Sequence, residues 1–255
     1  MSAPWGAAGV AVLTPEWPVP QGVRAAFTLR SGGVSAPPFD SLNLGAHVGD
    51  AAAAVAENRR RVRTQLRLPA EPAWIEQVHG TGVLDLDRSP QAPAPGAAAD
   101  AVIARRAGRV CAVQVADCLP VLFAACEGSV VGAAHAGWRG LAAGVLEATV
   151  AGLAVEPGRL LAWLGPAIGR EHFEVGDEVR TAFVGRDSRA ALAFAGNRRG
   201  RWQCDLVALA RQRLAALGVT AVFGGTWCTY ADAARFFSYR RDGRCGRMAA
   251  LVWLT

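Results

Sequence analysis

The sequence predicts an α+β protein, a layered sandwich built on a mixed β-sheet. Short apolar runs typical of buried strands recur along the chain, and segments of strong helix formers lie between them. No strict strand–helix–strand rhythm relates the two, which argues against an all-parallel sheet. With 255 residues, of which 52% are hydrophobic, the chain can build one large core. We expect residues 1–255 to form a single domain, with 1–20 as an N-terminal extension or an edge strand.

The first half of the chain combines loops, one helix and several strands. Residues 27–45 are dense in Gly, Pro, Ser and Asn, which predicts a loop. Residues 51–66 are strong helix formers that stop before a Leu-Pro pair, so we expect a helix there. The segments 96–106 and 109–137 give three short apolar runs separated by small polar breaks, the pattern of adjacent buried strands. Residues 91–99 (QAPAPGAAA) predict a flexible surface loop.

The second half of the chain alternates strands and helices. The helix expected from Asp205 to Leu217 has the clearest ends. Asp205 can accept hydrogen bonds from the first free N–H groups, and Gly218 can take the left-handed conformation that stops a helix. The other expected elements are helices over 141–153 and within 175–184, and strands at 160–165, 221–225 and 249–254.

Charge composition excludes several enzyme classes. The net charge is +6, and each of the 27 basic residues is an arginine. A chain without lysine has no Schiff-base lysine, no pyridoxal-phosphate lysine and no P-loop lysine. Anions must therefore be bound by arginine. The arginine-rich runs at 57–63 and 196–201 lack an aromatic-interleaved motif or zinc-finger spacing, so we expect small anionic ligands and no nucleic acid.

The cellular setting follows from what the sequence lacks. No apolar run approaches the roughly 18 residues of a membrane span, and the start MSAPWGAAGV lacks the features of a signal peptide. Six cysteines without a CxxC pair are typical of reduced thiols. We expect a soluble cytoplasmic protein with no membrane contact and no obligatory protein partner.

Three polar residues, His79, Cys118 and His135, each follow an apolar, strand-like segment. Catalytic zinc commonly takes three imidazole or thiolate ligands and keeps a fourth position for water. Since each residue stands at the end of an apolar run, the three could converge at one edge of a sheet. The alternative is two satisfied core histidines and a cysteine that acts as a small hydrophobe. We expect His47 and His172 to be surface residues, although His172 could support the ligands from behind, and we expect none of the other five cysteines to be a ligand.

The same atoms also allow a site without metal. Cys118 lies beside Asp117, and with His135 as a base it would form a cysteine nucleophile of the hydrolase or deamidase kind. One thiolate cannot readily be both a metal ligand and a free nucleophile. Metal analysis of protein purified without added zinc separates the two readings.

Five motifs occur in the order QVHG, ADCLPV, AAHAGWRG, GPAIG and FFSYRRDG. In this respect the chain resembles the polyphenol oxidase or laccase-domain family, also called the YfiH family of purine nucleoside phosphorylases. The resemblance extends from about FTLRSGGVS to the C-terminus. It implies a YfiH-like fold related to putative cysteine hydrolases. It also implies one zinc held by His79, Cys118 and His135, with copper as the other possible metal.

The resemblance further implies an activity. Family members cleave purine nucleosides such as adenosine, inosine and methylthioadenosine with phosphate, and they deaminate adenosine at the same site. We therefore expect a zinc-dependent purine nucleoside phosphorylase with adenosine deaminase activity, acting on purine nucleosides and phosphate. The alternatives are a copper-dependent polyphenol oxidase (laccase), a peptidoglycan-precursor editing hydrolase that uses Cys118, and a non-enzymatic metal-binding accessory protein. Few soft ligands surround the site, which disfavours a multicopper enzyme.

Phosphorolysis requires an anion beside the anomeric carbon of ribose. The planar fork of arginine binds phosphate oxygens in pairs, and an asparagine amide can bind a purine edge or ribose. The zinc deaminase pairing of H-x-E with P-C-x-x-C is absent, because the chain has no P-C-x-x-C, so the general acid/base is not identified. The expected substrate-binding residues are Asn43, Arg30, Arg59 and Arg139, and the expected catalytic residues are Cys118, His135 and Asp117.

Overall fold

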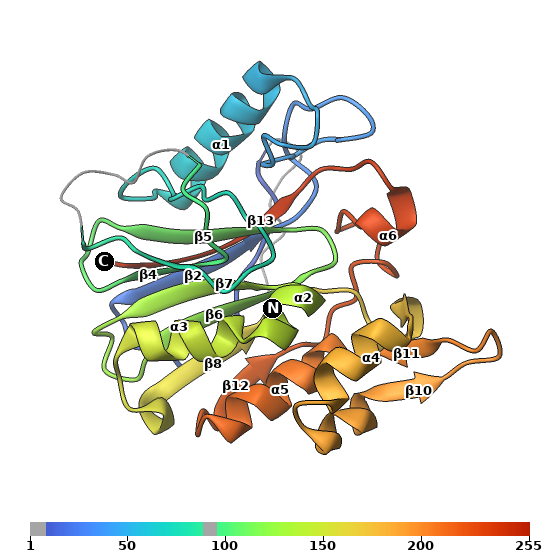
Figure 1. The fold of residues 1–255 in the computed structure, drawn as a ribbon. Helices are drawn as coiled ribbons and strands as arrows, with labels where there is room; N and C mark the ends of the chain where they lie inside the picture. Colours follow the sequence, from blue (N-terminus) through green and yellow to red (C-terminus); the bar gives the residue numbers. More distant parts are fainter. Residues whose placement is uncertain (1–8, 89–95) are drawn as a thin grey trace.

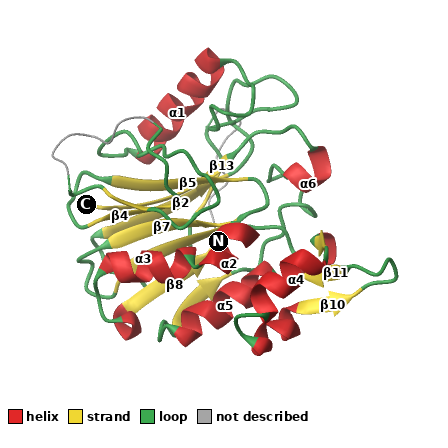
Figure 2. Cartoon of the chain, viewed as in Figure 1, coloured by secondary structure: helices red, strands yellow, loops and turns green. Residues whose placement is uncertain are grey.

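A computed structural model describes residues 9–88 and 96–255 and shows two large β-sheets stacked face to face (Figures 1 and 2). The smaller sheet has the strand order β1 (Val12–Leu13), β2 (Val23–Thr28), β13 (Met248–Leu254) and β5 (Val110–Val115). The larger has the order β12 (Ala221–Gly224), β8 (Leu160–Leu164), β6 (Leu119–Ala125), β7 (Val131–Ala136), β4 (Ala101–Ala104) and β3 (Val83–Asp85).

The six-stranded sheet is mixed. Its two outer pairs, β12 with β8 and β3 with β4, are parallel, whereas the three inner pairs are antiparallel. A separate three-stranded sheet has the order β10 (Phe194–Gly196), β11 (Trp202–Cys204) and β9 (Glu174–Val175). The expected α+β layered sandwich with a mixed sheet is confirmed.

Helices cover the outer surface of each large sheet (Figure 1). α1 (Ala52–Leu66) packs on the four-stranded sheet, where Val62 joins a core cluster with Leu251. The six-stranded sheet is covered on its outer face by α2 (Trp138–Ala143), α3 (Val145–Leu153), α4 (Asp177–Val184) and α5 (Leu206–Ala216). The remaining helical pieces are α6 (Tyr239–Asp242) and the 3-10 turns Pro157–Arg159, Arg170–His172 and Ser188–Ala193.

The central strands are buried on both faces, which explains their continuous apolar sequence. In β13, Met248, Ala250 and Val252 face the core between the sheets, and the alternate residues Leu251 and Trp253 face the α1 side. A period-2 pattern is therefore not visible in the sequence, because both sides of the strand require apolar residues.

Three details differ from the sequence-based expectations. Residues 96–137 form four strands, not three, and β5 belongs to the four-stranded sheet, so these strands are not all neighbours. The loop expected over 27–45 begins later, because Phe27 and Thr28 end β2. The helix expected over 141–153 is broken at Gly144, whose φ of 111° ends α2 and redirects the chain into α3.

Other boundaries agree with the sequence. The side chain of Asp205 accepts a hydrogen bond from the N–H of Ala208, and Gly218 has a φ of 88°, as expected for the ends of α5. Residues 1–8 and 91–95 of the expected terminal and loop segments lie outside the described residues. Within the described part, no helix is long and apolar enough to span a membrane.

Candidate metal centre and substrate cavity

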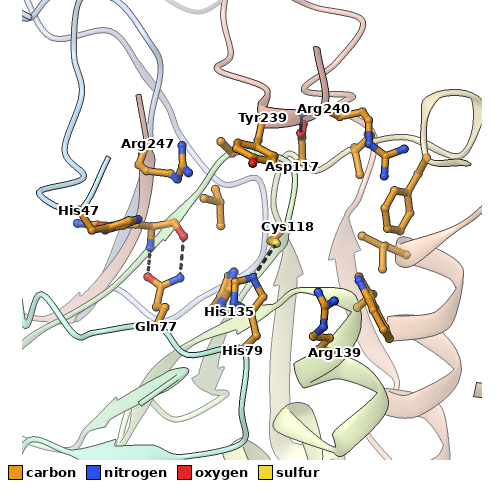
Figure 3. Close-up of a pocket in the computed structure, with 17 residues that line it drawn as sticks. His47, Gln77, His79, Asp117, Cys118, His135, Arg139, Tyr239, Arg240 and Arg247 are labelled. Atoms are coloured by element: carbon orange, nitrogen blue, oxygen red, sulfur yellow. Dashed lines mark hydrogen bonds between the residues drawn. The ribbon is translucent and has the colours of Figure 1, made fainter. Parts of the chain in front are cut away.

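Strand pairing brings Cys118 beside His135. β6 and β7 are antiparallel, and Pro120 lies opposite His135 in their register. Cys118, directly before β6, therefore lies at the end of β7 where His135 emerges. His79 reaches the same place from the loop before β3. The potential ligand atoms of the three residues all lie within 4.8 Å of one another, with Cys118 Sγ and His79 Nε2 3.9 Å apart (Figure 3).

Asp100 orients two of these residues, and sequence analysis missed it. Its buried carboxylate can only accept hydrogen bonds, so His135 donates through Nδ1, at 2.9 Å, and keeps Nε2 free for a ligand. The same carboxylate accepts the N–H groups of three consecutive residues, Val78, His79 and Gly80. This backbone cradle holds His79 at a φ of 60°, which is unusual for a residue other than glycine.

Electrostatic coupling between Cys118 and His135 is strong. Burial raises the pKa of the Cys118 thiol, but the nearby imidazoles of His135 and His79 outweigh burial and lower this pKa to about 6. Burial lowers the pKa of His135, but the Cys118 thiolate and the hydrogen bond to Asp100 raise it to about 9. The metal-free pair is thus a thiolate beside an imidazolium. Because a metal takes a neutral imidazole, we expect metal binding to release a proton.

Gly137 leaves no space for a side chain behind the cluster. A Cβ atom on Gly137 would lie 2.9 Å from Cys118 Sγ and 3.0 Å from His79 Cδ2. Its φ of −62° suits any residue, so the restriction comes from the ligands and not from the backbone. We expect Gly137→Ala to displace them and to weaken metal binding by about 10- to 100-fold, as perturbed ligand orientation does elsewhere. Metal content after dialysis measures this. Gly158→Ala is the control, because its Cβ meets nothing within 4 Å, and equal metal retention in both variants would contradict the expectation.

A cavity of about 540 Å³ opens beside the three residues. Three arginines line it, and each lies over an aromatic ring that also lines it. The distances from the guanidinium carbon to the ring centroid are 4.4 Å for Arg139 over Trp138, 5.3 Å for Arg240 over Phe173 and 5.8 Å for Arg247 over Tyr239. Figure 3 shows Arg247 on the other side of Cys118 from Arg139 and Arg240.

The cavity is positively charged. Among the described residues, Asp117 is the one carboxylate that lines it, and it is already hydrogen-bonded through both oxygens, to the hydroxyl of Thr229 and to the backbone N–H of Arg240, each at 2.6 Å. His47 also lines the cavity, and its pKa is lowered by burial and by the charges of Arg247 and Arg59. The cavity thus combines fixed positive charge with aromatic faces, which suits an anion together with a planar group.

A family model described as multi-copper polyphenol oxidoreductase laccase matches residues 24–255. The chain belongs to this laccase-domain family. The His-Cys-His cluster and the arginine-lined cavity are therefore features of a laccase-domain protein, as the motifs in the sequence suggested.

Relatives within the laccase-domain family are named purine nucleoside phosphorylases. One, from Pseudomonas aeruginosa, is 56% identical over 243 residues, which cover 95% of this chain and 98% of the relative. The YfiH purine nucleoside phosphorylase of Escherichia coli is 54% identical with the same coverage of both chains. A solved Neisseria meningitidis structure has a TM-score of 0.91 at 48% identity, covering 95% of this chain and 98% of that one. YlmD from Geobacillus stearothermophilus has a TM-score of 0.84 at 34% identity, covering 92% of each chain.

The structure brings only part of the expected substrate-binding and catalytic residues to this cavity. Arg139 and Asp117 line it, whereas Arg30 and Asn43 do not. Arg30 donates to the carbonyl groups of Asp40 and Ala233 and so ties two loops together. The buried amide of Asn43 accepts from the backbone N–H of Arg247, so it acts behind the cavity wall.

Arg59 lies outside this cavity, in the wall of an adjacent one. Its guanidinium donates twice to the carbonyl of Leu44 and stacks over Trp74 at 4.3 Å, in a neighbouring cavity of about 920 Å³. The two cavities share His47 and two glutamines in their walls. Direct substrate contacts by Arg30, Arg59 and Asn43 thus stay predictions that this geometry does not support.

Sequence reasoning missed several cavity residues. His47 was expected at the surface because it stands in loop-like sequence; it is exposed, but it also lines the cavity. Tyr239 and Arg240 occur in the motif FFSYRRDG, which signalled the family but gave no reason to choose these side chains. Arg247 follows shortly after in GRMAA. The available signal was the motif itself, since arginine and tyrosine at the end of a loop-rich motif are common binding residues.

Proposed function

We propose that the protein is a zinc-dependent purine nucleoside phosphorylase that acts on adenosine, inosine and methylthioadenosine and also deaminates adenosine. One observation carries the proposal. A single cavity combines a His-Cys-His donor set with three arginines stacked on aromatic rings. Phosphate, a purine ring and a metal-binding site can therefore meet within one space. The proposed partners are purine nucleosides and phosphate in the cytoplasm, without nucleic acid.

The donor set fits zinc. Two imidazoles and one thiolate form one of the ligand combinations of catalytic zinc, which keeps a fourth position open. Zinc bonds of about 2.1 Å to nitrogen and 2.3 Å to sulfur would hold the ligand atoms roughly 3.4–3.6 Å apart in a tetrahedral site. The ligand atoms now lie within 4.8 Å of one another, so a small movement of the side chains would bring them to these distances. When bound, zinc supplies Lewis acidity and, for deamination, an activated water.

Phosphorolysis is assigned to the arginines. Arg139, Arg240 and Arg247 would bind phosphate oxygens and place one beside C1′ of the ribose. A phosphate oxygen forms the new bond to C1′ as the bond from C1′ to the purine nitrogen breaks, and the electron pair leaves with the purine, which takes up a proton. The products are ribose 1-phosphate and the free base. The aromatic rings would hold the purine by stacking.

Product analysis tests the proposal. Purified protein is mixed with adenosine, with and without phosphate, and adenine, inosine, hypoxanthine and ribose 1-phosphate are resolved by chromatography. We expect adenine and ribose 1-phosphate only with phosphate, and inosine in both cases. Absence of all of these products from zinc-loaded protein would rule the proposal out.

Arg139 gives the cleanest test of the phosphate assignment. Within the described residues no hydrogen bond or ion pair engages its guanidinium, which only stacks on Trp138. We expect Arg139→Gln to raise the KM for phosphate about 10- to 100-fold, the loss of one charge-assisted contact of about 1.5–3 kcal/mol. Deamination needs no phosphate and should change little. The control is Arg159→Gln, at an exposed ion pair with Glu127, and an equal effect of the two substitutions on phosphate use would contradict the assignment.

A cysteine hydrolase is the second candidate, and one observation favours it. His135 lies between Cys118 and Asp100, so the three form a nucleophile, a base and a group that orients the base. An editing hydrolase for peptidoglycan precursors would use this arrangement without metal. Metal analysis decides: stoichiometric zinc in protein purified without added metal excludes a free Cys118 nucleophile. Phenol oxidation that depends on added copper would instead support a polyphenol oxidase.

A further inference from the structure

We infer that Asp117 is a positioning residue that fixes the α6 segment, with its cavity residues Tyr239 and Arg240, to the turn that carries Cys118. Asp117 was expected to be catalytic from its place beside Cys118. Its contacts indicate a different role. The kinetic test of this inference, the KM for phosphate, rests on the proposed phosphorolysis. The structural test, hydrogen exchange of the Arg240 amide, does not.

The backbone of Asp117 is the first observation. Its φ of 90° lies in the left-handed region, where glycine is favoured and a side chain causes strain. Such strain persists where the surrounding structure requires the residue. Glycine would relieve the strain at Asp117, so the carboxylate must provide something that glycine cannot.

The carboxylate contacts are the second observation. One oxygen accepts from the Thr229 hydroxyl and the other from the backbone N–H of Arg240, each at 2.6 Å, and Asp117 is only 8% exposed. The backbone carbonyl of Asp117 also accepts from the N–H of Ile168. Both carboxylate oxygens thus hold parts of the chain that are more than 100 residues away in sequence, which leaves Asp117 poorly placed to exchange a proton with a substrate.

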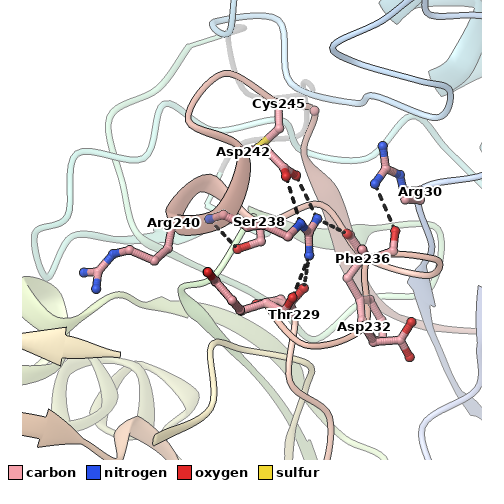
Figure 4. A network of polar contacts seen from close by, with 12 residues as sticks. Arg30, Thr229, Asp232, Phe236, Ser238, Arg240, Asp242 and Cys245 are labelled. Atoms are coloured by element: carbon pink, nitrogen blue, oxygen red, sulfur yellow. Dashed lines mark hydrogen bonds and ion pairs between the residues drawn. The ribbon is translucent and has the colours of Figure 1, made fainter. Parts of the chain in front are cut away.

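At Arg240, the α6 segment is held by the hydrogen bond to Asp117. Elsewhere it is held by Arg241, whose guanidinium donates to the carbonyl groups of Thr229, Tyr230 and Phe236 and pairs with Asp242 (Figure 4). These contacts fix the far side of the segment.

The side that faces the cavity carries Tyr239, which is 60% exposed, and Arg240. The hydrogen bond from the Arg240 N–H to Asp117 ties this side to the Cys118 turn. Losing that bond would free the backbone at Arg240 from the Cys118 turn. Among the described residues, the Glu174 carbonyl and the Phe173 ring alone would then hold the Arg240 side chain.

Three variants separate positioning from proton transfer. Asp117→Gly removes both carboxylate contacts and relieves the backbone. Asp117→Asn keeps one acceptor oxygen. Thr229→Val removes one hydrogen bond and leaves the carboxylate in place. The measurements are zinc content, kcat and KM for phosphate with adenosine, the pH profile of kcat, and hydrogen exchange of the Arg240 amide.

We expect Asp117→Gly to raise the KM for phosphate about tenfold or more, with kcat within about threefold, full zinc content and an unshifted pH profile. Exchange at the Arg240 amide should become faster in Asp117→Gly and stay slow in Thr229→Val, which should show a smaller KM effect. Asp117→Asn should fall between them.

Other outcomes overturn the inference. A loss of kcat by about a thousandfold with a missing limb of the pH profile would make Asp117 a general acid or base. Loss of zinc in Asp117→Gly would place its role at the metal. Unchanged hydrogen exchange at the Arg240 amide in Asp117→Gly would also overturn the inference. This measurement does not depend on activity. If the wild-type protein cleaves no nucleoside, only the proposed function is refuted.

Discussion

The Cys118→Ala variant is expected to lose its bound zinc and to retain at most about a thousandth of both phosphorolysis and deamination. Cys118 supplies the only thiolate among the three clustered donors of the described chain. The two histidines that remain would bind zinc far more weakly, because a site with two protein ligands leaves much of the coordination to water. Metal analysis after gel filtration and product assays measure the two losses together.

Cys126→Ala is the matched control for this prediction. Cys126 is exposed and lies beyond the far end of β6, so the same substitution removes a thiol without touching the cluster. We expect its zinc content and activity to equal those of wild type. Stoichiometric zinc in Cys118→Ala would show that the ligand set is misassigned, and activity of that variant without zinc would show that the reaction requires neither the metal nor the Cys118 thiolate.

The Asp100→Ala variant is expected to show the largest loss of stability. It leaves four N–H donors without their acceptor, three from part-buried hydrogen bonds to the backbone of residues 78–80 and one from buried His135. Since each unpaired donor costs about 1–3 kcal/mol and some regain water, we expect the free energy of unfolding to fall by roughly 3–5 kcal/mol. The melting temperature of a chain this long should then fall by roughly 10 °C.

Metal affinity should fall in the same variant by about 10- to 100-fold, because His79 and His135 both lose the group that orients them. Asp100→Asn keeps one acceptor and should show smaller changes in both measurements. Asp187→Asn, which alters an exposed ion pair with Arg189, is the control. Thermal unfolding with and without added zinc separates the two effects. Full stability of Asp100→Ala would mean that the backbone cradle at residues 78–80 forms without it.

Much of the fold could be predicted from the sequence. Apolar runs revealed the strands because the two sheets cover each other and each is covered again by helices. The caps of α5 were visible because Asp205 and Gly218 act on their immediate neighbours. The membership of β5 in the smaller sheet was not visible, because it depends on pairing with β13 at the far end of the chain. The break at Gly144 was missed because a glycine inside a helical pattern is often tolerated.

The candidate site also contains residues that the sequence could predict and residues that it could not. His79, Cys118 and His135 were identifiable because few residue types bind transition metals. Asp100 was not, since its importance lies in its distance to His135, which is 35 residues away. The arginines were the hardest to choose among, because the chain has 27 basic residues and only packing shows which of them face the cavity.

The antiparallel pairing of β6 with β7 has a consequence for how the centre assembles during folding. Cys118 and His135 are carried at the open end of one hairpin, so only a short loop must close to bring them together. His79 precedes them by a much longer stretch and can arrive only after β3 and β4 dock on that hairpin. We therefore expect a nascent chain to present a two-ligand half-site first, and metal capture to become tight only when the sheet is complete.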